Sequence, residues 1–353
     1  MDLSAQLITW YEENKRDLPW RNTTNPYHIW LSEIILQQTR VDQGLSYYNK
    51  FISHYPTVDL LANTNEDEVL KLWQGLGYYS RARNLHASAK IIHTQFNNIF
   101  PSTHKEVLAL KGVGEYTAAA ITSFAYNLPF AVIDGNVYRV LSRIFGIETA
   151  IDSSEGKNIF KNLAQELLNT NDPSTHNQAI MEFGALQCKP KKPNCEDCPF
   201  RLECVALKED LIGTLPFKEK KIKQRNRYFN YLIIENENSI YIKKRGENDI
   251  WQGLFDFPLI ETEKEITDIS KLDLNILNSK LSNETYIYKG VSQEYKHILS
   301  HQKIYAKFWR IELKSPIKIK APHIIIKKGE LTKYPVPKLI DNYMVTTNFS
   351  TSE

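Results

Sequence analysis

The chain has 353 residues, a hydrophobic fraction of 42% and a formal net charge of +3 at pH 7. This length exceeds what one hydrophobic core usually serves, so two domains are expected. The charge is too small to indicate a nucleic-acid partner by itself. Because no apolar run is long enough for a signal peptide or a membrane span, we expect an intracellular, cytoplasmic protein without membrane contact.

The first half of the chain is predicted to consist of helices joined by short turns. Apolar residues recur at helical spacing in residues 5–14, 27–39, 44–54, 67–74, 80–96, 103–111, 116–125, 136–145 and 156–168. Beyond residue 204, a basic segment (218–227) precedes alternating or β-branched runs over 228–235, 239–243 and 303–312. We therefore predict a mainly α-helical domain over 1–207, a basic linker over 208–227 and an α+β domain over 228–353.

The helix predicted over residues 27–39 carries one carboxylate, Glu33, among apolar neighbours such as Ile29, Trp30 and Leu36. Burial there would raise the pKa of Glu33, which suits a group that donates a proton near neutral pH. A lone glutamate at a helix edge usually faces solvent. The sequence leaves both positions of this side chain open.

The stretch LKGVGEYT, residues 110–117, places Gly112 and Gly114 on either side of Val113, between two predicted helices. Two glycines permit a tight turn whose backbone amides point outward at a helix N-terminus and bind a phosphate. An ordinary helix connection fits the same pattern equally well.

Asp134 directly precedes the helix predicted over residues 136–145. An aspartate in this place usually caps the free amides of the first turn. The helix dipole also favours its ionised form, so the same carboxylate could stabilise a positive charge that develops on a sugar.

All four cysteines of the chain lie between Cys188 and Cys204. Intracellular thiols stay reduced, so such a cluster favours a metal site over disulfides. Zinc and an iron–sulfur cluster are both compatible with four thiolates, but a single CxxC pair, at Cys195 and Cys198, is more typical of iron–sulfur. The lysines and arginine between the cysteines suit contact with phosphate.

Five stretches in order, LSEIILQQT, GLGYYSRARNL, LKGVGEYTAAAI, VIDGNVYRVLSR and the cysteine loop, resemble the MutY family of adenine DNA glycosylases. That family belongs to the helix-hairpin-helix base-excision enzymes. The resemblance runs from about residue 10 to residue 204 and implies two helical subdomains. It also implies a [4Fe–4S] cluster on Cys188, Cys195, Cys198 and Cys204. The implied partner is duplex DNA that carries adenine opposite 8-oxoguanine or guanine. The implied enzyme is a monomer that removes this adenine.

The resemblance also implies a role for individual side chains. Glu33 would protonate the leaving adenine and Asp134 would stabilise the oxocarbenium-like sugar, which is a sensible pair for breaking an N-glycosidic bond. Tyr116 and Asn136 would support them near the sugar. Gly112, Val113 and Gly114 would bind the DNA backbone. Gln38 and Tyr78 would insert into the duplex beside 8-oxoguanine.

In the second half of the chain, residues 229–258 resemble the start of a Nudix-like domain. No cluster of glutamates that could bind magnesium follows Gly253, so recognition without hydrolysis is expected. Residues 297–301, HILSH, match a loop that contacts 8-oxoguanine in the family, with Ser300 and His301 in the polar places. Leu299 stands where the family leads us to expect an aromatic residue.

Two alternatives to a monofunctional adenine glycosylase remain at this stage. A bifunctional, endonuclease III-like enzyme would need a nucleophilic lysine where this chain has Tyr116. A catalytically silent DNA-damage binding protein would have no need of the acids Glu33 and Asp134. Both observations favour the monofunctional glycosylase.

Overall fold

The computed structural model describes residues 2–219, 224–274, 285–315 and 323–349. The chain forms two compact units, which are considered separately. The helical unit comprises Met1–Asn63 and Asn84–Lys221, and the sheet unit comprises Thr64–Arg83 and Ile222–Glu353. The sheet unit thus includes a short segment from the part of the chain predicted as the helical domain.

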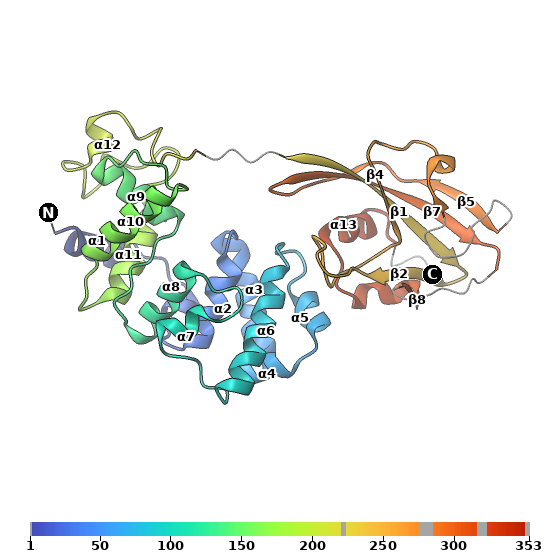
Figure 1. The fold of residues 1–353 in the computed structure, drawn as a ribbon, viewed down its shortest axis with the longest axis horizontal. Helices are drawn as coiled ribbons and strands as arrows, with labels where there is room; N and C mark the ends of the chain where they lie inside the picture. The colour runs from blue at the N-terminus through green and yellow to red at the C-terminus, as the bar shows by residue number, and fades with distance from the viewer. Residues whose placement is uncertain (1, 220–223, 275–284, 316–322, 350–353) are drawn as a thin grey trace. The chain divides into compact units, whose positions relative to one another are not determined.

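Helices follow one another from Leu3 to Lys208 (Figure 1). Their bounds are α1 (Leu3–Asn14), η1 (Pro19–Arg21), α2 (Pro26–Leu36), α3 (Val41–His54), α4 (Val58–Asn63), α5 (Glu66–Leu72), α6 (Ser80–Gln95), α7 (His104–Leu108), α8 (Glu115–Tyr126), α9 (Gly135–Phe145), α10 (Ser154–Leu167), α11 (Pro173–Leu186) and α12 (Val205–Lys208). Among the described residues, no helix has both the length and the apolar character needed to cross a membrane.

The nine predicted helices are confirmed, with ends that differ by a few residues, whereas α4, α11 and α12 were not predicted. The reason is clearest for α11. Its buried residues include His176, Asn177 and Glu182, so its inward face does not show the apolar stripe on which the prediction depended. Buried polar groups of this kind need partners from other elements, which the local sequence does not reveal.

One hydrophobic core of the helical unit lies between α1, α9, α10 and α11. Trp10 meets the edge of Phe183 with ring centroids 5.0 Å apart, and Leu141 and Phe160 are fully buried in the same cluster. A second contact, between α2 and α8, brings together two helices that carry predicted site residues. The core therefore fixes the helices on which the candidate site is built.

The sheet unit contains a mixed sheet in which β1 and β7 pair in parallel, while the other pairs between described strands are antiparallel (Figure 1). The predicted strands are confirmed as β1 (Arg225–Asn236), β2 (Ser239–Lys244) and β7 (Gln302–Leu313). Shorter strands that were not predicted are β3 (Phe255–Asp256), β4 (Leu259–Thr262), β5 (Tyr286–Val291), β6 (Tyr295–Ile298) and β8 (His323–Lys327). Two 3-10 helices, η2 (Ile269–Lys271) and η4 (Lys328–Lys333), and helix α13 (Lys338–Thr346) complete the unit.

The segment predicted as a linker, residues 208–227, is structured at both ends. Leu215 is buried, and the Arg143 guanidinium donates a hydrogen bond to its carbonyl oxygen at 3.2 Å. At the other end, β1 begins at Arg225, three residues before the predicted start of the second domain. Residues 220–223 of this segment lie outside the described residues.

Candidate active site

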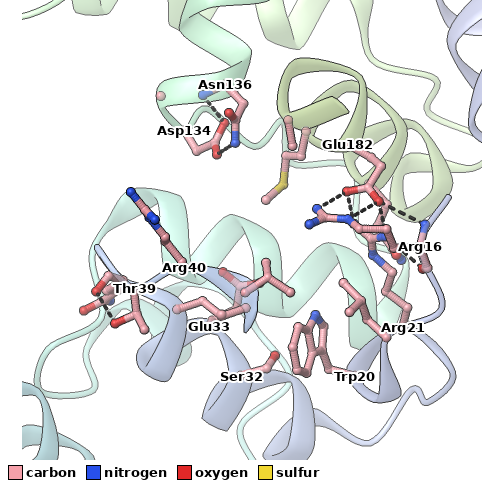
Figure 2. Close-up of a pocket in the computed structure, with 18 of the residues that line it drawn as sticks. Arg16, Trp20, Arg21, Ser32, Glu33, Thr39, Arg40, Asp134, Asn136 and Glu182 are labelled. Carbon is pink, nitrogen blue, oxygen red and sulfur yellow. Dashed lines mark hydrogen bonds and ion pairs between the residues drawn. The ribbon is translucent and has the colours of Figure 1, made fainter. Parts of the chain in front are cut away.

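A cavity of about 930 Å³ opens in the helical unit (Figure 2). Four predicted site residues line it: Glu33 from α2, Tyr116 from α8, and Asp134 and Asn136 from the start of α9. Figure 2 shows Glu33 on one wall and Asp134 with Asn136 on the opposite wall, facing the same space. The fold thus assembles residues from three separate helices around one cavity.

Glu33 is held on a helix that is almost entirely buried. Pro26 stands at the start of α2, and the Asn25 side chain caps the helix by accepting a hydrogen bond from the Tyr27 amide at 2.9 Å. Glu33 itself is only 7% exposed, which settles the choice that the sequence left open in favour of a buried acid.

The surroundings of Glu33 suit a proton donor. Burial raises the pKa of this carboxyl to about 7, although the hydrogen bond from the Tyr116 hydroxyl acts in the opposite direction. That hydroxyl donates to Glu33 Oε2 at 2.8 Å. Near neutral pH the carboxyl is therefore protonated in a substantial fraction of molecules, as general acid catalysis requires.

Asp134 caps α9, as predicted. One of its oxygens, Oδ1, accepts hydrogen bonds from the backbone amides of Asn136 and Val137, both at 2.8 Å. The other, Oδ2, accepts from the Asn136 side-chain amide at 2.7 Å. Burial raises the pKa of Asp134, against the expectation from the helix N-terminus alone, and the three hydrogen bonds oppose that rise. The carboxylate has a fixed direction at the cavity wall.

A third residue, Arg139, extends this network away from the cavity. Its guanidinium donates to Asn136 Oδ1 at 2.8 Å and to the Gly184 carbonyl oxygen at 2.6 Å. Its Nε donates to the carbonyl oxygen of Cys188 at 2.7 Å. Asn136 thus lies between Asp134 and a buried arginine that contacts the start of the cysteine loop. Arg139 was not among the predicted site residues.

The cavity wall also contains an ion cluster that the sequence analysis missed. Glu182 accepts hydrogen bonds from Arg16 at 2.6 to 3.0 Å and from Arg21 at 2.7 and 2.8 Å (Figure 2). Burial alone would raise the pKa of Glu182, but the two arginines hold it at about 2. The only sequence signal was a single acid in the apolar run AIMEFGAL, residues 179–186.

The glycine turn between α7 and α8 depends on the backbone conformation of Gly112. Gly112 has a φ of 78°, and a β-carbon there would lie 2.8 Å from that of Asn84, so this position requires glycine. Gly114 is the N-cap of α8. Both glycines are exposed while Val113 is buried, so the turn presents backbone at the start of a 12-residue helix.

Gln38 and Tyr78 share an unusual backbone, with φ values of 56° and 48°. Such left-handed conformations are uncommon for residues other than glycine and often occur at functional sites. Both side chains are exposed. Gln38 belongs to the helical unit and lines the cavity, whereas Tyr78 belongs to the sheet unit.

Within the sheet unit, Tyr78 meets a residue 222 positions away. Its hydroxyl lies 2.7 Å from the hydroxyl of Ser300, a hydrogen-bonding distance. Ser300 and His301 form the tip of the hairpin between β6 and β7, where the Leu299 amide donates to the Gln302 carbonyl oxygen at 2.9 Å. We call residues 299–302 the reading turn. The hydrogen bond between Tyr78 and Ser300 joins predicted lesion-binding residues from two distant parts of the sequence.

The four cysteines line one small apolar cavity with Phe183 and Phe200. None forms a disulfide. Burial raises the pKa of the thiols of Cys195, Cys198 and Cys204, and neighbouring cysteines add to this effect. The pKa of Cys198 is raised to about 11. Among the described residues, no three His, Cys, Asp or Glu side chains are arranged to hold a single metal ion.

Family models match both halves of the chain. Residues 31–166 match the HhH-GPD superfamily of base excision DNA repair proteins. Residues 230–345 match the NUDIX domain. The two matches fall on the segments that carry the helices and the sheet.

Curated relatives extend the similarity over most of the chain. The adenine DNA glycosylase of Buchnera aphidicola subsp. Baizongia pistaciae is 36% identical over 303 residues, which are 85% of this chain and 83% of that protein. The adenine DNA glycosylase of Arabidopsis thaliana is 32% identical over 361 positions, covering 87% of this chain and 57% of its own. Among solved structures, a thermostable thymine-DNA glycosylase is 29% identical with a TM-score of 0.55, covering 58% of this chain and 95% of its own.

Proposed function

Because this chain belongs to the adenine DNA glycosylase family of base excision repair enzymes, we propose that it removes adenine mispaired with 8-oxoguanine or guanine in duplex DNA. The observation that carries the proposal is the pair of acids, Glu33 and Asp134, facing each other across one cavity (Figure 2). One acid has a pKa near neutrality, and the other is a fixed, hydrogen-bonded carboxylate. The alternatives of a lyase and of a silent binding protein are not favoured.

In the proposed reaction, the adenine flips out of the duplex into the cavity. Glu33 donates its proton to the leaving adenine as the bond between base and sugar breaks. Asp134 lies ready to stabilise the positive charge that develops on the sugar, and this charge in turn favours its ionised form. Water adds to the sugar carbon and releases a proton, which leaves free adenine and an abasic site in an uncut strand.

Cutting the strand would require an amine nucleophile, which forms a Schiff base with the sugar. The described residues that line the cavity include three arginines and no lysine. Tyr116 occupies the place expected for such a lysine, and burial raises the pKa of its hydroxyl well above 10. It therefore stays protonated and hydrogen-bonded to Glu33, which supports hydrolysis without strand cleavage.

We assign Cys188, Cys195, Cys198 and Cys204 as ligands of a [4Fe–4S] cluster. The support is that all four line one apolar cavity as free thiols, and that burial, to which neighbouring cysteines add, raises the pKa values of Cys195, Cys198 and Cys204. A bound cationic core would favour their thiolate forms. In such a cluster each cysteine binds a different iron, so the sulfurs need not surround a single ion. The cluster would order a loop whose lysines suit DNA phosphates.

The cluster assignment predicts that anaerobically purified protein is brown and contains about four irons per chain. Iron and acid-labile sulfide analysis would measure this. Stoichiometric zinc without iron would contradict the assignment.

For recognition of the lesion we propose the reading turn, with Tyr78 and Gln38 inserted into the duplex nearby. 8-Oxoguanine carries a hydrogen-bond donor at N7, where guanine has only an acceptor. The Ser300 hydroxyl can accept from that donor while it is hydrogen-bonded to Tyr78 at 2.7 Å. His301 is exposed next to it and can contact the same nucleotide.

The deciding experiment is single-turnover excision from duplexes that carry adenine opposite 8-oxoguanine, guanine or thymine. Products are resolved with and without alkali, which cuts only at abasic sites. We expect excision in the order 8-oxoguanine, then guanine, then thymine, and strand breaks only after alkali. Breaks without alkali would indicate a lyase, and tight binding without any excision would indicate a binding protein.

A further inference from the structure

We propose that Gln224 and Arg227 are positioning residues that fix the reading turn and thereby set how strongly the enzyme prefers 8-oxoguanine to guanine. The inference rests on the proposed role of Ser300 and adds two residues that need not touch the base. Arg227 lies at the start of β1 and Gln224 directly precedes that strand, and both belong to the basic segment that was predicted as a linker.

The two residues at which the chain enters β1, Gln224 and Arg225, hydrogen-bond to the backbone of the turn. The Gln224 side-chain amide lies 3.3 Å from the Leu299 carbonyl oxygen and 3.4 Å from that of Ser300. The Arg225 backbone amide donates to the His301 carbonyl oxygen at 3.1 Å. Three consecutive carbonyl groups of the turn are therefore bound from one strand end.

Arg227 anchors the other end of the turn. Its Nε and one terminal nitrogen donate to the two carboxylate oxygens of Glu261, both at 2.6 Å. Its other terminal nitrogen donates to the side-chain oxygen of Gln302 at 3.1 Å. Gln302 is buried and follows His301 directly. The planar guanidinium thus connects β4 to the first residue of β7, which a lysine could not do with the same geometry.

These anchors act where the turn is otherwise weakly held. One of the two backbone bonds that close the turn, from the Gln302 amide to the Leu299 carbonyl oxygen, is 3.4 Å long. On its other side, Ser300 reaches the Tyr78 hydroxyl at 2.7 Å. A displacement of about 1 Å would break such a bond. The position of the Ser300 hydroxyl therefore depends on what holds the turn from β1.

A direct phosphate contact by Arg227 is the competing interpretation of a basic segment. The Arg227 side chain is only 14% exposed and its charge is matched by Glu261. Its guanidinium also lies over the Phe229 ring, 4.7 Å from the centroid. These contacts engage all three nitrogens of the guanidinium and match its charge, so the geometry favours a positioning role.

The test compares Gln224→Ala and Arg227→Lys with a matched control in the full-length protein that carries its cluster. The control is Arg310→Lys, because Arg310 on β7 pairs with Glu235 on β1 at the far end of the same two strands. The measured quantity is the ratio of single-turnover rates for adenine opposite 8-oxoguanine and opposite guanine, together with thermal unfolding and the salt dependence of binding.

We expect the ratio to fall roughly 3- to 10-fold in Arg227→Lys and about 2- to 5-fold in Gln224→Ala, as one or two hydrogen bonds are lost. Arg310→Lys should leave it unchanged. An unchanged ratio in both positioning variants would overturn the inference. So would an equal loss on both substrates with a salt dependence reduced by about one phosphate, which would indicate backbone contact. If Arg227→Lys does not fold, the exposed Gln224 decides the outcome.

Ser300→Ala separates this inference from the function on which it rests. If Ser300→Ala leaves the ratio unchanged, the reading role of the turn fails, and the positioning role fails with it. If Ser300→Ala lowers the ratio while Gln224→Ala and Arg227→Lys do not, only the positioning role fails.

Discussion

The cavity in the helical unit and the reading turn in the sheet unit differ in how far their functional groups are exposed to water. At the cavity, burial raises the pKa of Glu33 to about 7 and so creates a proton donor. At the turn, the hydroxyl groups of Ser300 and Tyr78 meet at 2.7 Å in an exposed place. Proton transfer depends on desolvation, whereas recognition of a base edge depends on hydrogen-bonding groups that DNA can reach.

This difference has an experimental consequence. Changes in the cavity should slow excision from every substrate by a similar factor, because each reaction uses the same acids. Changes in the turn should alter the ratio between substrates and leave the slower reaction nearly intact.

Glu33→Gln should have the largest effect. The amide keeps the shape and the hydrogen bond to Tyr116 but has no proton to donate, so excision should fall by roughly 100- to 10,000-fold. Single-turnover rates on both mispairs measure this, with DNA affinity as the control that the protein remains folded. Near-normal excision would remove Glu33 from the mechanism.

Ser300→Ala combined with His301→Ala should reduce the preference for 8-oxoguanine over guanine. A lost contact of this kind is worth about 1 to 3 kcal/mol, or roughly 5- to 150-fold in the ratio. Excision opposite guanine should change little. A parallel loss on the two mispairs would mean that the turn supports the sheet unit in general.

The fall in rate at alkaline pH should follow Glu33, because only its protonated form is active. With a pKa of about 7, excision at limiting enzyme should fall about tenfold per pH unit above 7, and it should also fall in acid, where protonation of Asp134 removes the charge that stabilises the sugar. Glu33→Gln should abolish the alkaline fall in whatever activity remains. A rate that rises between pH 7 and 9 would contradict the assignment of Glu33 as the acid.

Tyr116→Phe should have the smallest effect of these changes. Its hydroxyl lowers the pKa of Glu33 through the hydrogen bond of 2.8 Å, so its removal should shift the fall in rate to higher pH. We expect less than about a tenfold change in rate at pH 7. A shift to lower pH would show that the hydroxyl does not stabilise the carboxylate form.

Sequence predicted the features that depend on neighbours along the chain. Helical spacing located α2 and α9, and a single aspartate before an amphipathic run identified the cap at Asp134. The burial of Glu33 could not be decided in this way, because Tyr116, which contacts it, lies 83 positions away. Local pattern carries no information on what packs against a helix from elsewhere.

Features built from distant polar residues were not predicted from pattern at all. The Arg16, Arg21 and Glu182 cluster joins residues up to 166 positions apart. The proximity of Tyr78 and Ser300 was foreshadowed only by the roles that the family resemblance gave them. The Arg16, Arg21 and Glu182 cluster satisfies polar groups that are buried or partly buried, a requirement that acts on the folded molecule and leaves little trace in local composition.

The parallel pairing of β1 with β7 also has a consequence for how the protein is made. Arg227 and Gln302, which meet where the two strands begin, lie 75 positions apart. Pairing of such distant segments closes a large loop and is slow compared with the formation of local structure. During synthesis, β1 cannot pair with β7 until the residues of β7 have left the ribosome. The capacity to discriminate between substrates therefore arises late in the life of the nascent chain.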